Sequence, residues 1–212
     1  GYAAVKLGYK HLGFLGGMSV PAVTRFGYGY VQGVDEAAKE LGITSDVELE
    51  YVCGGQFYGD ADITAYMDTW YGSKGVEVVF ACGGGIYTSA AEAAAKVDGK
   101  VIGVDSDQSG IIGEDITVTS AMKGLGSAVE AALDAYTSGN WSSIGGKSEQ
   151  LGLTQGDYLG LPTADASWGF KTFTKDEYET VLNGIKDGSI TVSNDTENQP
   201  EVGSHVTVTY VE

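Results

Sequence analysis

The chain has 212 residues, of which 42% are hydrophobic, so it is long and apolar enough to bury a sizeable core. It carries 29 acidic and 12 basic residues, a formal net charge of -17, and a surface this acidic repels nucleic-acid backbones and anionic membranes. No run of about 18 apolar residues occurs, so no segment is predicted to span a membrane. The two cysteines, Cys53 and Cys82, close apolar runs, and this favours two buried small side chains over a disulfide.

Short apolar runs alternate with longer helical segments over the first half of the chain. Runs typical of strands occupy residues 11–15, 47–53, 76–82 and 100–105, and helical patterns occupy residues 21–41, 60–74 and 87–97. Pro21 suits the first turn of the first long helix, and Gly42 follows its end. Strands that alternate with helices predict an α/β fold, a parallel sheet with helices on both faces.

The pattern changes after residue 115. We expect a short strand at 116–119, a long helix from Ser120 as N-cap to about residue 137, and a strand pair at 150–153 and 158–161. A helix at 175–186 follows, with Thr174 as its N-cap, and further β segments are predicted near 189–192 and 205–211. The chain also opens within helix-like sequence, residues 1–8, that has no capping residue.

The ends of the four strands predicted in the first half share one chemical character. Glycine pairs or triplets follow the first three strands at residues 16–17, 54–55 and 83–85, and the fourth strand ends in the polar run Asp-Ser-Asp-Gln at 105–108. In an open parallel sheet these ends lie along one edge, where ligands bind. Glycine lets the backbone approach a ligand and present its N–H groups, so the sequence predicts a binding crevice at this edge.

The common enzymatic motifs are missing: the sequence has no P-loop, dinucleotide fingerprint, nucleophile elbow or zinc-ligand spacing. We therefore predict no enzymatic activity, no cofactor and no bound metal. One alternative stays open, because Asp105 and Asp107 are a pair that a magnesium- and nucleotide-dependent enzyme could use. In a binding protein such a carboxylate would accept hydrogen bonds from ribose hydroxyls, and the plainest interpretation is a turn-forming aspartate.

Two further side chains are candidates for the same crevice. Phe57 follows the second glycine pair and could stack on a planar base or simply pack against the protein. Lys123 is predicted in the first turn of the helix after residue 120, where a cation opposes the helix dipole. A ligand hydroxyl or Asp105 would compensate that cost, and the alternative is a solvated surface lysine.

Four segments, taken in order and at their spacing, are distinctive. They are GFLGGM at 13–18 with Pro21 and Arg25-Phe26, FACGGGIY at 80–87, VIGVDSDQ at 101–108 and TSAMK at 119–123. Together they resemble the basic membrane protein family, the purine-nucleoside-receptor-type lipoproteins that are substrate-binding components of ABC transporters. The resemblance covers nearly the whole chain, and its GVDSDQ and TSAMK parts are the most specific.

The resemblance implies the type I periplasmic-binding-protein architecture, in which two lobes joined by crossing strands hold a ligand between them. Residues 9–115 would form the second, Rossmann-like lobe. Residues 1–8 would be a truncated helix of the first lobe, and residues 116–212 a crossing strand and the completion of that lobe. The first lobe is therefore expected to be incomplete in this chain.

The resemblance also implies a ligand, a nucleoside and most simply a purine one. Asp105 resembles the ribose-binding aspartate, Lys123 the ribose-contacting lysine, and Phe57 the aromatic residue that stacks on the base, with Tyr58 as its rival. The residues predicted to bind ligand are Phe57, Gly83, Gly84, Asp105, Asp107 and Lys123.

The same resemblance implies a place and partners for the protein. It would lie on the extracellular face of the cell membrane, held by a lipid anchor that is not in this chain, and would work with ABC permease subunits rather than nucleic acid. A ligand-sensing regulatory domain on the same fold is the remaining alternative.

Overall fold

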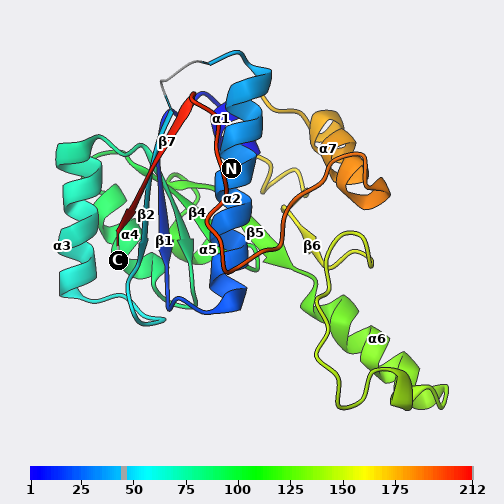
Figure 1. Cartoon of the computed structure of the whole chain (residues 1–212). Coiled ribbons are helices and arrows are strands. Elements are labelled where there is room, and N and C mark those ends of the chain that lie inside the picture. The colour runs from blue at the N-terminus through cyan, green and yellow to red at the C-terminus, as the bar shows by residue number, and fades with distance from the viewer. Residues whose placement is uncertain (44–46, 212) are drawn as a thin grey trace.

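The computed structural model describes residues 1–43 and 47–211, and a single sheet dominates this part of the chain. Its strands are β1 (His11–Gly16), β2 (Val47–Cys53), β3 (Val78–Cys82), β4 (Lys100–Asp105), β5 (Thr117–Lys123), β6 (Leu159–Gly160) and β7 (Val206–Val211). They are ordered β6-β5-β4-β3-β1-β2-β7 (Figure 1). Neighbouring strands run parallel except for β6, which is antiparallel to β5.

Helices cover both faces of the sheet, so the predicted α/β architecture is confirmed (Figure 1). The helices are α1 (Tyr2–Lys6), α2 (Pro21–Glu40), α3 (Ala61–Thr69), α4 (Tyr87–Ala94), α5 (Ser109–Ile112), α6 (Leu125–Thr137) and α7 (Lys175–Asp187), with a π-helical turn at Trp70–Lys74. One apolar core lies between the sheet and α1 and α2, and a second lies between the sheet and α3, α4 and the π-helical turn.

The alternation of side chains along β1 shows how the two cores are built. Leu12 and Phe14 belong to the core under α2, whereas Leu15 belongs to the core under α3 and α4. This is the two-residue period of a strand. Because β1 and β3 lie inside the sheet and are covered on both faces, β3 is apolar throughout and β1 is apolar after His11, as is typical of parallel sheets.

Several predictions for the second half of the chain are wrong. Residues 117–123 form one strand, so Ser120 is fully buried in β5 rather than capping a helix. Helix α6 begins only at Leu125, with Gly124 at its N-cap. Residues 150–153 and 189–192 are not strands. Of the strand predicted at 158–161, only the two residues of β6 pair with a neighbouring strand. The helix capped by Thr174 and the strand at 205–211 are confirmed as α7 and β7.

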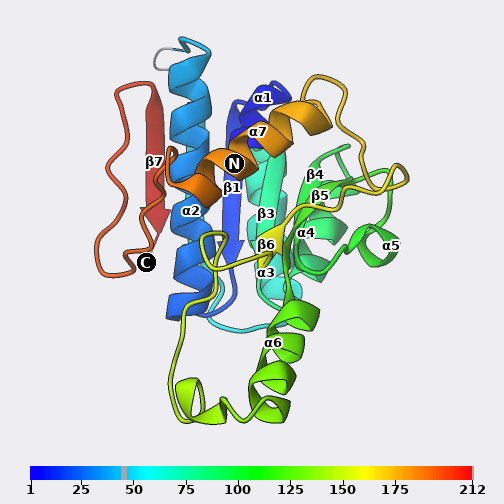
Figure 2. The ribbon, with the colours of Figure 1, turned by 90° about the vertical axis from the view of Figure 1, so that its right-hand side faces the viewer.

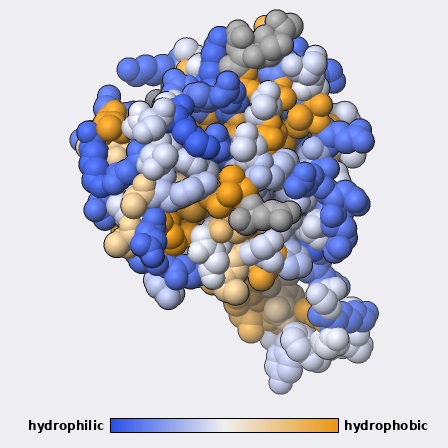
Figure 3. Space-filling model, turned by 60° about the vertical axis from the view of Figure 1, so that its left-hand side comes forward, coloured by the Kyte–Doolittle hydropathy of each residue, from blue (hydrophilic) through white to orange (hydrophobic). Residues whose placement is uncertain are grey.

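The segment between β5 and β7 lies largely outside the two helical layers. Helix α6 projects from the body, and none of its residues is buried (Figure 2). The face in Figure 3 is mostly hydrophilic, with hydrophobic colour at the foot where α6 projects. The exposed apolar residues of α6 are Leu125, Val129, Leu133 and Tyr136.

The sheet contains strands from both sides of the lobe boundary that was predicted at residue 115. β5 pairs with β4, and β7 pairs with β2 at the opposite edge. Helix α1 packs against α2. The assignment of residues 1–8 and 116–212 to a first lobe therefore stays a prediction. None of the helices in residues 1–43 and 47–211 is both long and apolar enough to cross a membrane.

Candidate ligand-binding site

The carboxyl ends of β1, β2 and β3 meet at one edge of the sheet, and backbone hydrogen bonds join the loops that follow them. The N–H of Gly17 donates to the carbonyl of Cys82 at 2.9 Å, which joins the loops after β1 and β3. The N–H groups of Gly54 and Gly55 donate to the carbonyls of Gly16 and Gly17 at 2.8 and 2.9 Å. The loops therefore form one continuous surface.

Phe57 lies on this glycine surface. A Cβ atom added to Gly17 would be 2.5 Å from Cδ1 of Phe57, and one added to Gly83 would be 3.1 Å from the same atom. The ring therefore needs both glycines in order to lie so close to the backbone. It remains 42% exposed, so one side of an aromatic ring is open to solvent at this edge. Tyr58, its rival, is 63% exposed and bridges to Gly85 through the backbone.

Gly83 and Gly84 shape the turn between β3 and α4. Gly84 has a φ of 52°, in the left-handed region that favours glycine. The turn is fastened by the N–H of Gly85, which donates to the carbonyl of Phe57 at 2.7 Å. In the part of the chain that the structure describes, nothing accepts a hydrogen bond from the N–H groups of Gly83 and Gly84. These groups can still donate to another molecule.

Asp105 and Lys123 end the adjacent strands β4 and β5, and their side chains form an ion pair. Lys123 Nζ lies 2.6 Å from Asp105 Oδ1, and the two side chains are 35% and 40% exposed. Lys123 also lies over the ring of Phe26 from α2, 5.1 Å from its centroid. The helix-dipole argument for Lys123 is wrong, because the residue ends a strand and not the first turn of a helix. The same argument suggested Asp105 as a group that compensates Lys123, and Asp105 does lie beside Lys123.

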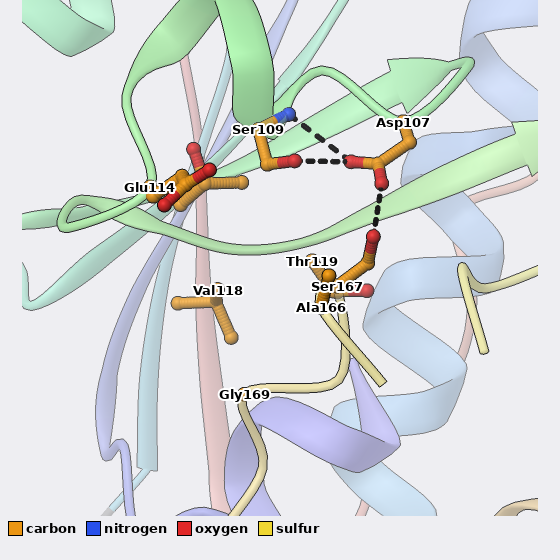
Figure 4. A pocket seen from close by; sticks show the side chains of 9 residues that line it. Asp107, Ser109, Glu114, Val118, Thr119, Ala166, Ser167 and Gly169 are labelled. Atoms are coloured by element: carbon orange, nitrogen blue, oxygen red, sulfur yellow. Dashed lines mark hydrogen bonds between the residues drawn. The ribbon is translucent and has the colours of Figure 1, made fainter. Parts of the chain in front are cut away.

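Asp107 has different partners from Asp105. Its Oδ1 accepts from the N–H and hydroxyl of Ser109 at 3.1 and 2.8 Å, and its Oδ2 accepts from the hydroxyl of Ser167 at 2.6 Å (Figure 4). The hydrogen bond from Ser167, followed by those from Ser109, holds the pKa of Asp107 below its usual value. Asp107 thus fastens the chain after β4 to a distant loop.

A cavity of about 70 Å³ lies beside this contact and includes Glu114 in its lining (Figure 4). The described residues contain no group of three or more histidine, cysteine or acidic side chains arranged to hold a metal. Asp105 and Asp107 are therefore not gathered with further ligands into one cation site, as the enzymatic alternative requires.

The two cysteines flank Gly16 on β2 and β3, with β1 between them. Two intervening strand spacings separate their backbones by about 9.6 Å, whereas a disulfide needs Cα atoms within about 7 Å. Both thiols are free, and burial raises the pKa of Cys53 and raises that of Cys82 to about 12. The interpretation as buried small side chains is the one the geometry supports.

Sequence reasoning missed three residues of this edge. Phe26 contacts Lys123, but on α2 it is one more apolar residue of an amphipathic helix. Gln108 and Ser120 are buried polar residues next to Asp105. Gln108 is the last residue of the distinctive segment 101–108. Its place in that segment is the only feature of the sequence that points to a role for Gln108.

Solved structures share this α/β fold, among them solute-binding proteins of ABC transporters. An ABC transporter solute-binding protein from Conexibacter woesei superposes with a TM-score of 0.65 at 18% identity, covering 91% of this chain and 63% of that one. This likeness confirms the predicted type I binding-protein fold class. The chain belongs to the Bmp family of PnrA-like ABC transporter substrate-binding proteins, whose family model matches residues 1–197.

Curated relatives support the same family. Basic membrane protein B of Borreliella burgdorferi is 34% identical over 168 residues, which is 78% of this chain and 47% of the relative. The ABC transporter nucleoside-binding protein BmpA of Lactococcus lactis is 31% identical over 198 residues, 85% of this chain and 52% of the relative. The chain thus spans about half the length of these relatives. Members of this family bind substrates for transport and are not enzymes, which agrees with the missing enzymatic motifs.

Proposed function

We propose that the edge formed by Phe57, Gly83, Gly84, Asp105 and Lys123 is one wall of a cleft that binds a nucleoside, with purine nucleosides preferred. The observation that carries the proposal is the half-exposed ion pair of Asp105 and Lys123 at the same sheet edge as an open aromatic ring. A nucleoside presents the matching chemistry, a diol on the ribose and a flat base. The family membership and the name of the Lactococcus lactis relative support this ligand class.

Each group has a separate task in this proposal. Asp105 accepts hydrogen bonds from the ribose hydroxyls, and Lys123 donates to a hydroxyl while offsetting the charge of the carboxylate. Phe57 stacks on the base, and a purine offers the larger surface for that contact. The N–H groups of Gly83 and Gly84 serve acceptors on the ligand. Asp107, already bonded to Ser109 and Ser167, contributes by shaping the loop rather than by direct contact.

The charge of the site favours a nucleoside over a nucleotide. The chain has a net charge of -17, and Asp105 adds a carboxylate to the proposed cleft. Placing a phosphate dianion beside a partly desolvated carboxylate is costly. We therefore expect adenosine to bind far more tightly than AMP.

The opposite wall of the cleft belongs to the other lobe in this proposal. Residues 9–115 form the second lobe, and residues 1–8 and 116–212 contribute to the first. The exposed apolar face of α6 supports this division, because another layer of protein would bury it. We further propose that the protein acts on the extracellular face of the cell membrane, through a lipid anchor outside this chain, and delivers its solute to ABC permease subunits.

Calorimetry with adenosine and AMP tests the proposed ligand class, on this chain and on the whole gene product where that is longer. Asp105→Asn removes the charged acceptor and should weaken adenosine binding by roughly thirtyfold, equivalent to about 2 kcal/mol. Asp68→Asn is the matched control, since Asp68 on α3 also pairs with a lysine, at 2.8 Å, and its side chain is 41% exposed against 40% for Asp105. AMP binding as tight as adenosine binding, or Asp105→Asn with wild-type affinity, would contradict the proposal.

A further inference from the structure

The backbone at Asp105 is strained. Asp105 has a φ of 68°, and Asp98 is the one other non-glycine residue with a positive φ in the described ranges. The N–H of Ser106 donates to the carbonyl of Val104 at 2.8 Å, closing a three-residue turn around Asp105. A γ-turn with a positive φ at its centre is rare and unfavourable, so other contacts must hold it.

A buried glutamine side chain reaches back to the residue before this turn. Gln108 is 7% exposed, and its Oε1 accepts from the N–H of Val104 at 2.8 Å. Pairing between β3 and β4 ends at Ile102, so β3 no longer restrains the strand at Val104. Gln108 thus replaces the missing strand partner just where the turn begins.

Ser120 of β5 fixes the glutamine in turn. Its hydroxyl, completely buried, accepts from the N–H of Gln108 at 3.0 Å. Gly103, paired with Ser120 across the ladder, leaves room for both groups. A Cβ there would be 2.7 Å from Gln108 Oε1 and from Ser120 Oγ. Three residues beyond Ser120 the same strand ends at Lys123, so one network connects the backbones that carry both members of the ion pair.

We infer that Gln108 and Ser120 are positioning residues, which hold Asp105 in its left-handed turn and thereby aim its carboxylate toward Lys123 and the bound solute. The binding part of this inference rests on the proposed function. Neither residue needs to touch the ligand. The turn makes the carboxylate project from the edge of the sheet, whereas an extended backbone at Asp105 would direct it elsewhere.

The experiment measures the backbone of Asp105 directly, by NMR of the 212-residue chain. The HN–Hα and one-bond Cα–Hα couplings of Asp105 distinguish a positive φ from extended backbone. Gln108→Met keeps the length of the side chain but removes the acceptor, Ser120→Ala removes the hydroxyl, and Gln108→Glu retains an accepting oxygen. We expect the couplings to shift toward extended values in Gln108→Met and Ser120→Ala, and Gln108→Glu to restore them. Adenosine affinity should fall about tenfold in the first two, as expected for loss of a buried hydrogen bond.

Two controls separate positioning from general damage. Gln155→Met removes the same kind of bond, since Gln155 Oε1 accepts from the N–H of Gly152 at 2.9 Å on an exposed loop. Val31→Ala opens a cavity in the core under α2, at a fully buried residue that takes no part in the hydrogen bonds of Gln108 and Ser120. Neither control should change the couplings of Asp105 or the affinity for adenosine.

The outcomes distinguish this inference from the proposed function. Couplings that stay at positive-φ values in both Gln108→Met and Ser120→Ala would overturn the inference, as would an equal shift in Val31→Ala. A shift in the couplings without loss of adenosine affinity, in a protein that binds adenosine, would also overturn it. If the wild-type protein bound no nucleoside, the proposed function would fail, whereas the couplings would still decide whether the network holds the turn.

Discussion

The strain at Asp105 predicts an unusual order of stability for two substitutions that remove the same carboxylate. Asp105→Ala retains a Cβ in the left-handed conformation, whereas Asp105→Gly removes it. Both variants lose the ion pair with Lys123 equally. Glycine at this position should therefore give the more stable protein, although alanine is the more stable of the two in ordinary helices and strands.

The magnitude follows from two opposing quantities. A left-handed conformation costs a residue with a Cβ about 1–2 kcal/mol. Glycine loses about 0.5–1 kcal/mol relative to alanine because its unfolded chain is freer. The midpoints of these ranges leave glycine more stable by about 0.75 kcal/mol, which in a chain of this size shifts the melting temperature by roughly 1.5–3 °C. The half-exposed ion pair contributes at most about 1 kcal/mol, and it cancels between the two variants.

Urea unfolding followed by circular dichroism measures the effect, with the denaturant slope checked for constancy. Glu130, exposed in α6, provides the control, because Glu130→Ala should be more stable than Glu130→Gly by about 1 kcal/mol. Adenosine binding should be lost to the same extent in both Asp105 variants. If Asp105→Ala proved as stable as Asp105→Gly, the argument from backbone strain would be refuted.

Three further predictions concern the surroundings of the site. Ser167→Ala should raise the pKa of Asp107 toward its ordinary value, and a carbon-13 NMR titration measures this. Because the folded-state pKa is lowered, the hydrogen bond stabilises the protein at pH values above the unfolded-state pKa. That stabilisation is lost as the pH falls through the folded-state pKa. An unchanged pKa would mean that the bond to Ser167 is not made in solution. Gly17→Ala should displace the ring of Phe57 and weaken adenosine binding in calorimetry, and unaltered affinity would exclude that ring from the site. Thr174→Ala, which removes a capping box, should lower the free energy of unfolding by about 1 kcal/mol in urea, and no change would show that α7 is not part of the cooperative unit.

The first half of the fold was predictable because its strands are buried and its helices are amphipathic. The strands at 47–53 and 100–105 were predicted with the bounds that the structure shows. The carboxyl ends of these parallel strands could be assigned to one edge for the same reason, since topology alone brings them together.

The second half was harder to predict because its elements depend on distant partners. Residues 117–123 carry small and polar side chains with no clear period, and they form a strand because β4 is available to pair with them. Ser120 has the residue type of an N-cap, but its hydroxyl is used by Gln108. Without knowing that pairing, a helix beginning at Ser120 was a reasonable but incorrect prediction.

The candidate site was predicted partly for the wrong reason. The helix-dipole argument offered Asp105 as a partner for Lys123, but it placed Lys123 on a helix that does not include it. For Asp107, prediction from the sequence failed because its main partner is far away in the chain. A carboxylate two residues from Asp105 suggested a shared role, but Ser167, sixty residues away, accounts for its orientation. No local pattern reveals a contact over that separation.

The position of β7 has a consequence for how the protein folds. β7 pairs with β2 along its length, although most of the chain, residues 54–205, separates the two strands. Until residues 206–211 have been synthesised, β2 remains an uncovered sheet edge, and such edges invite pairing with other chains. Closing so long a loop is also slow. The folding chain should therefore depend on chaperones most strongly before β7 is available, and removal of β7 should make the protein aggregate rather than merely lose stability.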